Sequence, residues 1–421
     1  MSSIQFNEKN WNASGSILTI VFRYFIVKTM RAVELFTGAG GLAVALSKAG
    51  VEHRALIERD KDCCATIRKN IDLLKTGADE IHVFEGDTRV FNYDQINESV
   101  DIVAGGPPCQ PFSLGGKHKG YDDQRDMFPE AVRAIRSLKP RAFIFENVKG
   151  LTRKVFASYL EYIVLQLTYP ELIKRDREAW YDHRDRLEKY HTKGYARQLE
   201  YKVMFRVLNA ADYGVPQKRE RVFFVGFRAG MGAHWTFPEP THSYDALLKS
   251  KWVTGEYWKK HKISPPRSGR PETERLNRYV SNLFIDERKP WMTVRDAISD
   301  LPDPLKPNAI PNHEYRGGSK RYQGHTGSVL DEPAKTLKAG VHGVPGGENM
   351  VVLPDGTTRY FTNREAARVQ TFPDSYIFTG SWTEIMRQIG NAVPVELGKV
   401  IVDSVMKALN RDERTSTLQS A

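Results

Sequence analysis

The feature that most constrains the fold is a repeat in which a short apolar strand pattern ends in a polar or glycine-rich loop and a helix pattern follows. The first unit is RAVELFTGAGGLAVALSKAG, which predicts a strand over 32–36, a loop with Gly38, Gly40 and Gly41, and a helix that ends at Gly50. Further strand patterns are VEHRALIERD, IHVFEGD, VDIVAGG and RAFIFENV. Strands that alternate with helices predict a mostly parallel sheet with helices on both faces.

Polar groups stand where these predicted strands end. Glu58 ends the second strand, Asp87 the third and Glu146 the fifth, while the stretch GGPPCQPFS, with Cys109, follows the fourth. Ligands of open parallel sheets bind outside the carboxyl ends of the strands. We therefore expect the glycine loop and these four groups to lie on one rim and to form a single site.

The glycine loop also indicates the class of cofactor. FTGAGG lacks the third glycine of the G-x-G-x-x-G pattern, which disfavours a site for a dinucleotide pyrophosphate. Glu58 follows Gly38 by about 20 residues, where an acidic side chain can bind the two hydroxyls of a ribose. A nucleoside cofactor without a pyrophosphate fits this pattern best, and S-adenosylmethionine is the leading candidate.

The amino-acid composition limits the classes of molecule that this protein is expected to bind. The 421 residues include 62 Lys and Arg against 51 Asp and Glu, and the net charge of +11 favours a polyanion such as nucleic acid. Three cysteines, two of them adjacent (Cys63 and Cys64), exclude a disulfide framework and a C-x-x-C metal pair, so we expect no metal and a reducing compartment. The apolar run 17–27 is too short to span a bilayer, so we expect no membrane partner and a poorly ordered extension over 1–29.

The rest of the chain predicts a division into domains. We expect a cofactor-binding domain over 30–230, and the charged stretch KRDREAWYDHRDRLEKY predicts a solvated helical insertion at about 152–202. Residues 231–383, rich in Pro, Gly and Trp with weak periodicity, predict a smaller irregular domain. A C-terminal segment over 384–411, with a Gly-Asn turn, a proline and an amphipathic helix, would return to complete the first domain. Residues 412–421 would be a disordered tail.

The ordered set of motifs resembles the DNA cytosine-5 methyltransferase family, in its prokaryotic modification-methylase form. The stretches that carry the resemblance occur in the family's order between about Ala32 and Leu409: VELFTGAGG, LIERD, EGD, GGPPCQPFS, FENV, QKRER, REAARVQTFP and QIGNAVP. The resemblance implies a Rossmann-like α/β sheet of the S-adenosylmethionine-dependent methyltransferases, mixed and mostly parallel. It also implies that the second, irregular domain is a target-recognition domain.

The resemblance further implies a role for individual residues. Cys109 would be the nucleophile, Glu146 would contact the ring nitrogen and amino group of the target cytosine, Arg221 would contact the base, and Arg219 would contact neighbouring backbone or the active-site loop. Glu58 would bind the ribose of the cofactor. Asp87 and Thr88 would bind the adenine of the cofactor. The other implied cofactor contacts are Phe36, Gly38, Gly40, Gly41, Pro108, Asn391 and Val393. The implied DNA contacts are Gln110, Ser113, Thr336 and Leu337.

Chemistry accounts for these residue types. Carbon 5 of cytosine becomes nucleophilic when a thiolate adds to carbon 6, and cysteine is the side chain best suited to that addition. The charge that reaches nitrogen 3 needs a proton, which a buried carboxyl with a raised pKa at Glu146 can supply, while a guanidinium at Arg221 can bind the carbonyl oxygen. A duplex hides carbon 6 within the stack, so the base must be flipped out.

Three alternatives stay open: a transfer-RNA cytosine-5 methyltransferase, a nicotinamide-dependent oxidoreductase, and a non-catalytic DNA-binding relative. The size of the region 231–360 favours a reader of duplex DNA, and QKRER with the basic charge disfavours the oxidoreductase. We therefore expect a monomer that methylates double-stranded DNA at a specific site in a bacterial cytoplasm, associated with the nucleoid. As part of a restriction-modification system, it would share that site with a cognate endonuclease that need not be bound to it.

Overall fold

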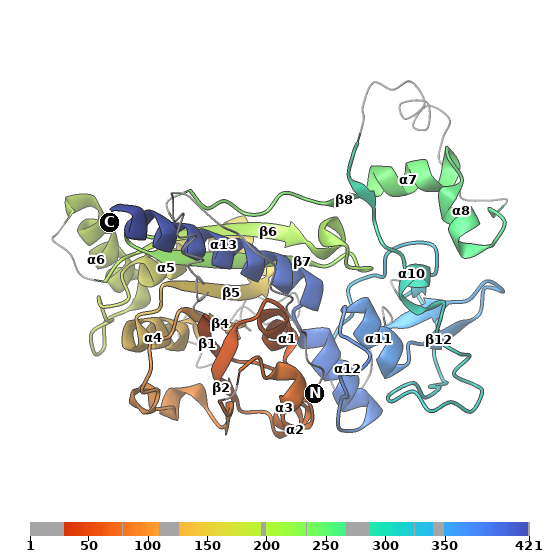
Figure 1. The fold of residues 1–421 in the computed structure, drawn as a ribbon, viewed down its shortest axis with the longest axis horizontal. Helices are drawn as coiled ribbons and strands as arrows, with labels where there is room; N and C mark the ends of the chain where they lie inside the picture. The colour runs from red at the N-terminus through yellow and green to blue at the C-terminus, as the bar shows by residue number, and fades with distance from the viewer. Residues whose placement is uncertain are drawn as a thin grey trace, which may run out of the picture.

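A seven-stranded sheet forms the centre of the computed structural model, which describes residues 29–77, 79–108, 126–194, 199–232, 234–266, 286–323, 325–339 and 349–419, the last seven by their backbone alone. The strand order is β3-β2-β1-β4-β5-β7-β6 (Figure 1). Only β7 runs against its neighbours in this sheet, which confirms the prediction of a mixed, mostly parallel sheet. The strands are β1 (Arg31–Leu35), β2 (Glu52–Glu58), β3 (His82–Glu85), β4 (Ile102–Gly105), β5 (Ala142–Val148), β6 (Tyr201–Asn209) and β7 (Glu220–Arg228).

Helices cover both faces of this sheet, because the central strands are apolar on both sides. Successive side chains of a strand point to opposite faces. Accordingly, Ala32 of β1 belongs to one hydrophobic cluster and Val33 to the other. The helices of the first cluster are α1 (Gly41–Lys48), α11 (Asn363–Val369), α12 (Trp382–Asn391) and α13 (Val395–Gln419). Those of the second are α4 (Phe128–Leu138), α5 (Ala157–Thr168) and α6 (Trp180–Lys193).

The first helices follow the sequence signals that predicted them. The helix α2 (Lys61–Lys69) begins after Asp60, whose carboxylate accepts hydrogen bonds from the backbone N–H groups of Asp62 and Cys63. Asp60 is thus the N-cap. A short helix, α3 (Ile71–Leu74), follows directly and leads to β3.

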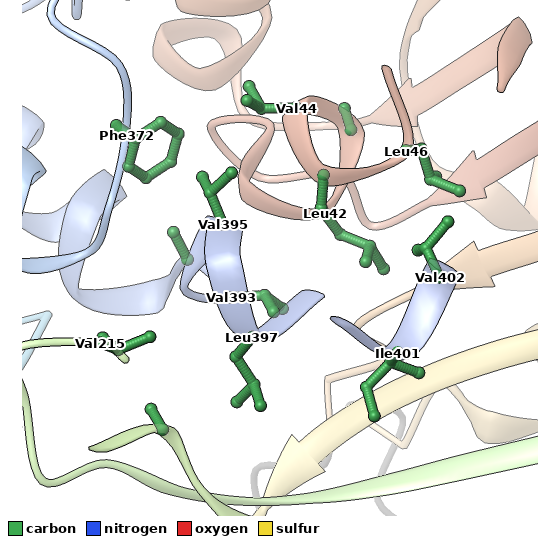
Figure 2. Close-up of a cluster of buried hydrophobic side chains, with 14 of the residues drawn as sticks. Leu42, Val44, Leu46, Val215, Phe372, Val393, Val395, Leu397, Ile401 and Val402 are labelled. Atoms are coloured by element: carbon green, nitrogen blue, oxygen red, sulfur yellow. The ribbon is translucent and has the colours of Figure 1, made fainter. Parts of the chain in front are cut away.

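The end of the chain returns to the first helix of the fold. Figure 2 shows Leu42 and Leu46 of α1 in one cluster with Leu397 and Val402 of α13 and with Val393, which lies just before α13. The cluster also includes residues from before the predicted boundary at 384, namely Phe361, Phe372 and Tyr376. The hydrophobic core of the first domain is therefore built from both ends of the sequence.

The predicted insertion at 152–202 contains two different helices. Residues of α5 such as Tyr159, Ile163 and Leu167 are buried against the sheet, so α5 is a core helix and the expectation of a solvated insertion is wrong for this part. The charged stretch forms α6, where only His183 and Leu187 are buried. The polar composition of α6 hid the apolar run YLEYIVLQL that precedes it.

The second region lies at one end of the molecule and has little regular structure (Figure 1). A small hydrophobic cluster there contains Leu247, Tyr257 and Trp258, with Trp252 and Trp291 packed against it. Its strands are β8 (His242–Ser243), β9 (Lys289–Pro290), β10 (Ser328–Val329), β11 (Met350–Val352) and β12 (Thr358–Tyr360), and its helices are α7 (Tyr244–Trp252), α8 (Glu256–His261) and α10 (Val294–Ile298). In the described part of the chain, no helix has both the length and the apolar character needed to cross a membrane.

Gly390 tests how tightly α12 packs against the segment at Lys338 and Ala339. A Cβ at Gly390 would lie 2.5 Å from the backbone nitrogen of Ala339, whereas a Cβ at Gly77 would meet only the end of the Glu52 side chain, at 2.3 Å. We expect Gly390→Ala to lower the free energy of unfolding by about 1–3 kcal/mol, although alanine is the better helix former. Gly77→Ala should change it by less than about 0.5 kcal/mol. Urea unfolding measures both, and equal values would contradict the close packing at Gly390.

Candidate active site

Four of the predicted site residues that the structure describes lie at the carboxyl ends of the parallel strands. Glu58 ends β2, Asp87 follows β3, Pro108 lies just beyond β4, and Glu146 lies near the end of β5. Cys109, Gln110 and Ser113 lie outside the described residues. Among the residues that are described, no group of His, Cys, Asp and Glu has the arrangement of a metal site.

The glycine loop after β1 is held by the C-terminal part of the chain. The Tyr376 hydroxyl donates a hydrogen bond to the Ala39 carbonyl at 2.7 Å. Gly40 has a positive φ of 84°, and a Cβ there would lie 2.6 Å from the Tyr376 hydroxyl oxygen. A Cβ at Gly41 would lie 2.3 Å from the carbonyl oxygen of Val393. These two glycines therefore allow the loop and the C-terminal segment to approach each other closely.

Glu58, the predicted ribose ligand, is held in place by backbone hydrogen bonds. Its carboxylate accepts hydrogen bonds from three backbone N–H groups: Gly38 at 2.8 Å, Arg59 at 2.9 Å and Asp60 at 2.8 Å. A carboxylate has about four lone-pair sites, so one remains for a hydroxyl donor. The bond from Gly38 also ties the glycine loop to the end of β2. Phe36, which precedes this loop, has a positive φ of 54° and is half-buried.

Asp87 and Thr88 form the neighbouring part of the rim. Asp87 accepts hydrogen bonds from the Arg89 backbone at 2.9 Å and from its guanidinium at 2.6 Å. The guanidinium lowers the pKa of Asp87 to about 2, so its carboxylate remains a hydrogen-bond acceptor at neutral pH. Thr88 is buried, and its carbonyl accepts a hydrogen bond from Arg133 of α4.

Glu34 is a buried carboxyl that the sequence analysis did not identify. It is 1% exposed in the middle of β1, and its Oε2 has no hydrogen-bond partner. Burial raises the pKa of Glu34, and the negative charge of Glu58 adds to this effect. An unpartnered carboxyl beside the glycine loop fits a site that receives a cationic group, such as the sulfonium or ammonium of S-adenosylmethionine. The available signal was a single acidic residue within the apolar strand AVELF.

Glu146 and Arg221 form a buried ion pair at the end of β5. Arg221 Nε lies 2.8 Å from Glu146 Oε1, and Val148 pairs with Arg221 in the β5–β7 register. Burial raises the pKa of Glu146, while the positive charges of Arg221 and Arg219 oppose the rise. The loop after β4 passes close by, because a Cβ at Gly106 would lie 3.5 Å from Glu146 Oε2. A carboxyl and a guanidinium thus stand together where the predicted cytosine contacts were expected.

Asn147 is a second buried residue that the analysis of FENV did not single out. Its Nδ2 donates a hydrogen bond to the Pro107 carbonyl at 2.9 Å, which fixes the loop after β4 against the end of β5. The backbone N–H of Met127 donates to the Pro108 carbonyl at 3.1 Å. The described segments before and after 109–125 are therefore joined by a backbone hydrogen bond.

Arg219 connects separate segments through their backbones. It is fully buried, and its guanidinium donates to the carbonyls of Leu337 at 3.0 Å, Gly390 at 2.7 Å and Ala392 at 3.1 Å. Burial lowers the pKa of Arg219 well below its usual range. These contacts make Arg219 a positioning residue in the structure, and a direct part in catalysis stays a prediction.

Two buried glutamines extend the contacts of Arg219. Gln217 accepts a hydrogen bond from the Leu337 backbone N–H at 2.9 Å and donates one to Gln370 at 3.0 Å. Gln370 in turn donates to the Ile389 carbonyl at 2.7 Å. The QKRER, VQTFP and QIGNAVP motifs therefore share one polar network, which we call the glutamine–arginine network and define as Gln217, Arg219 and Gln370.

The remaining predicted DNA and cofactor contacts, which lie after residue 330, differ in how far their side chains are buried. Leu337 was expected to contact DNA, but its side chain is 0% exposed and lies in the hydrophobic core, so this expectation is wrong for the side chain. Thr336 is half-buried and donates to the Lys218 carbonyl at 2.7 Å. Val393 is buried against Gly41, and Asn391 is exposed.

Comparisons with known proteins identify the family of this chain. The model of the family described as C-5 cytosine-specific DNA methylase matches residues 30–169 and 181–407. The Type II methyltransferase M.PspPI of Psychrobacter sp. (strain TA137) is 33% identical over 382 residues, which cover 90% of this chain and 79% of the relative. The Type II methyltransferase M.Eco47II of Escherichia coli is 32% identical over 383 residues, with the same coverage of 90% and 79%.

Solved structures show the same fold. The S. pombe Dnmt2 methyltransferase superposes with a TM-score of 0.54 at 16% sequence identity, and the match covers 90% of this chain and 99% of that chain. Because the family model matches most of the sequence, the chain belongs to the C-5 cytosine-specific DNA methylase family. It is a DNA cytosine-5 methyltransferase, and its methyl donor is S-adenosylmethionine.

The different surroundings of Arg219 and Arg221 lead to a matched pair of substitutions. Arg219→Lys should lower the free energy of unfolding by roughly 2–4 kcal/mol, because lysine cannot serve three separate carbonyls. Arg221→Lys keeps a cation beside Glu146 and should change stability by less than about 1 kcal/mol. It should still reduce the methylation rate roughly 10-fold to 100-fold. Urea unfolding measures the stability of both variants, and single-turnover methylation measures their rates. An Arg219→Lys variant as stable as the wild type would contradict the role given to Arg219.

Proposed function

We propose that this enzyme methylates carbon 5 of a cytosine flipped out of double-stranded DNA, through a covalent bond between Cys109 and carbon 6. The observation that carries the proposal is the buried pair of Glu146 and Arg221 beside Pro107 and Pro108, the residues that lead to Cys109. The other two cysteines are poor alternatives, because burial raises the pKa of both Cys63 and Cys64, that of Cys64 to about 12.

Each side chain of the pair has one task in this reaction. The Cys109 thiolate adds to carbon 6, and the electron pair displaced from the ring reaches nitrogen 3, where protonated Glu146 donates its proton. Arg221 binds the carbonyl oxygen and holds the ring in place. Carbon 5 of this adduct is nucleophilic and would bond to the methyl group that S-adenosylmethionine supplies, leaving S-adenosylhomocysteine. A base then removes the proton that remains on carbon 5, whose electron pair re-forms the double bond to carbon 6 as the Cys109 thiolate departs. The proton on nitrogen 3 returns to Glu146.

The cofactor residues fit S-adenosylmethionine, which supplies an electrophilic methyl group when bound. Glu58 would hold the ribose hydroxyls, and Asp87 with Thr88 would hold the adenine. Phe36, Gly38, Gly40, Gly41 and Pro108 would line the pocket, with Asn391 and Val393 closing it from the end of the chain. The unpartnered carboxyl of Glu34 supports a cationic ligand in this region.

The relatives support a role in a restriction-modification system, since those reported above are named Type II methyltransferases. We therefore propose that the enzyme acts as a monomer at one specific DNA sequence, at which a cognate endonuclease would cut unmodified DNA. The target-recognition domain would be the region at 231–383, in which Thr336 would contact DNA. In the first domain, Gln110 and Ser113 would contact DNA as well.

Cys109→Ala tests the proposed nucleophile. We expect it to abolish methylation while DNA affinity stays within about threefold, because the thiol takes part in bond formation rather than in backbone contacts. Bisulfite sequencing of DNA from cells that express each protein gives both the activity and the recognition site. Cys64→Ala, a change at a buried cysteine, is the matched control and should retain methylation.

The outcomes separate the proposal from its alternatives. Methylated cytosines at one sequence context in the wild type, absent from Cys109→Ala, support it. Methylation of a transfer-RNA transcript in place of duplex DNA would contradict it, and so would full turnover in Cys109→Ala.

The raised pKa of Glu146 predicts a pH dependence. The reaction needs this carboxyl protonated, so kcat/KM should fall as the pH rises through its pKa, which burial places above the ordinary carboxyl range. In Glu146→Gln, the amide donates a hydrogen bond but cannot give up a proton, so this variant should methylate more slowly than the wild type. Because the amide does not titrate, its rate should also lack this fall at high pH. Single-turnover rates across pH measure it, and an unchanged fall at high pH in Glu146→Gln would contradict the assignment.

A further inference from the structure

A small exposed projection follows β5 directly beyond the Glu146–Arg221 pair. It comprises Arg153, Lys154 and Val155. Arg153 joins the 3₁₀ helix η4 (Lys149–Thr152) to the 3₁₀ helix η5 (Lys154–Phe156), and Lys154 and Val155 are the first two residues of η5. We call these three residues the 153–155 knuckle. Both cations are exposed, and Val155 is 67% exposed at the tip.

The knuckle is rigidly mounted. Leu151 before it is 0% exposed and Phe156 after it is 5% exposed, and both belong to the hydrophobic cluster beneath α5. The Arg153 N–H donates to the Gly150 carbonyl at 3.3 Å, and the Phe156 N–H donates to the Arg153 carbonyl at 2.8 Å. Buried anchors on both sides thus present three exposed side chains in a fixed position, which lowers the entropy that a binding partner must offset.

The charges of the knuckle are not neutralised by the rest of the described chain. Lys149 lies just before it and pairs with Glu220 at 2.7 Å, next to Arg221 in β7. By contrast, neither Arg153 nor Lys154 has a carboxylate partner among the residues that the structure describes. Two free cations and an apolar tip therefore stand on the same rim as the active site.

We propose that the 153–155 knuckle binds the sugar-phosphate backbone of the DNA next to the target cytosine. Arg153 and Lys154 would contact phosphates, and Val155 would pack against a deoxyribose between them. This inference rests on the proposed function, because it needs DNA to enter the site at Glu146 and Arg221. Contacts to phosphate position the protein without reading sequence, so the knuckle would orient the duplex over the site rather than choose its recognition sequence.

A double substitution, Arg153→Gln with Lys154→Gln, tests the proposal on the full-length protein. Each lost phosphate contact should lower the slope of log affinity against log salt by about 0.9, so the pair should lower it by about 2 and weaken DNA binding about tenfold or more at 0.1 M salt. The loss should be alike for DNA with and without the recognition site. The rate at saturating DNA should stay within about threefold, which a damaged active site would not allow.

The matched control is Lys69→Gln with Lys75→Gln. These two lysines are exposed: Lys69 is the last residue of α2, and Lys75 directly follows α3. Neither has a carboxylate partner among the described residues. The control should keep the wild-type affinity and slope, and circular dichroism verifies that both double variants are folded.

The outcomes distinguish the knuckle from the proposed function. A loss of affinity and slope in the knuckle variant alone supports the proposal. Wild-type methylation of duplex DNA with an unchanged salt slope in the knuckle variant overturns the knuckle and leaves the proposed function standing. An equal loss in both double variants also overturns it, since the effect would then follow net charge. A wild type that neither binds nor methylates duplex DNA overturns both.

Discussion

The rest of this structure depends on the buried glutamine–arginine network of Gln217, Arg219 and Gln370. Arg219 alone joins three backbone carbonyls, from Leu337, Gly390 and Ala392. Buried polar groups are costly unless they are paired, so these donors and carbonyls stabilise the fold only when all the segments are in place. The start of β7, the end of the second region and the end of α12 are thereby fixed relative to one another.

This arrangement links the two halves of the active site. Arg221 lies two positions after Arg219 on β7 and reaches Glu146, while Val393 lies directly after Ala392 and packs on Gly41 of the glycine loop. The Glu146–Arg221 pair and the glycine loop are thus both connected to this network. The same network also binds the backbone of Leu337, within the region proposed to recognise DNA. That region is therefore connected directly to the strand that carries Arg221.

Much of the fold and the rim of the site could be predicted because their signals are local. The strand ending at Glu58, the cap at Asp60 and the carboxyl at Glu146 each follow from a few consecutive residues and the rule for parallel sheets. The partners of Arg219 could not be predicted, because they lie far along the chain and are backbone carbonyls without a residue signature. Leu337 was misassigned for the same reason, since its burial depends on distant segments, and the burial of α5 was hidden by its charged neighbour α6.

The covalent bond between Cys109 and the target base is the central claim of this account. Duplex DNA that carries 5-fluorocytosine at the recognition site tests it most directly, because fluorine at carbon 5 cannot leave as a proton does. Incubated with the protein and S-adenosylmethionine, this DNA should form an adduct that survives denaturation, and mass spectrometry should place it on the peptide that contains Cys109. A folded protein that binds the cofactor yet forms no adduct, or forms it at Cys63 or Cys64, would contradict the account.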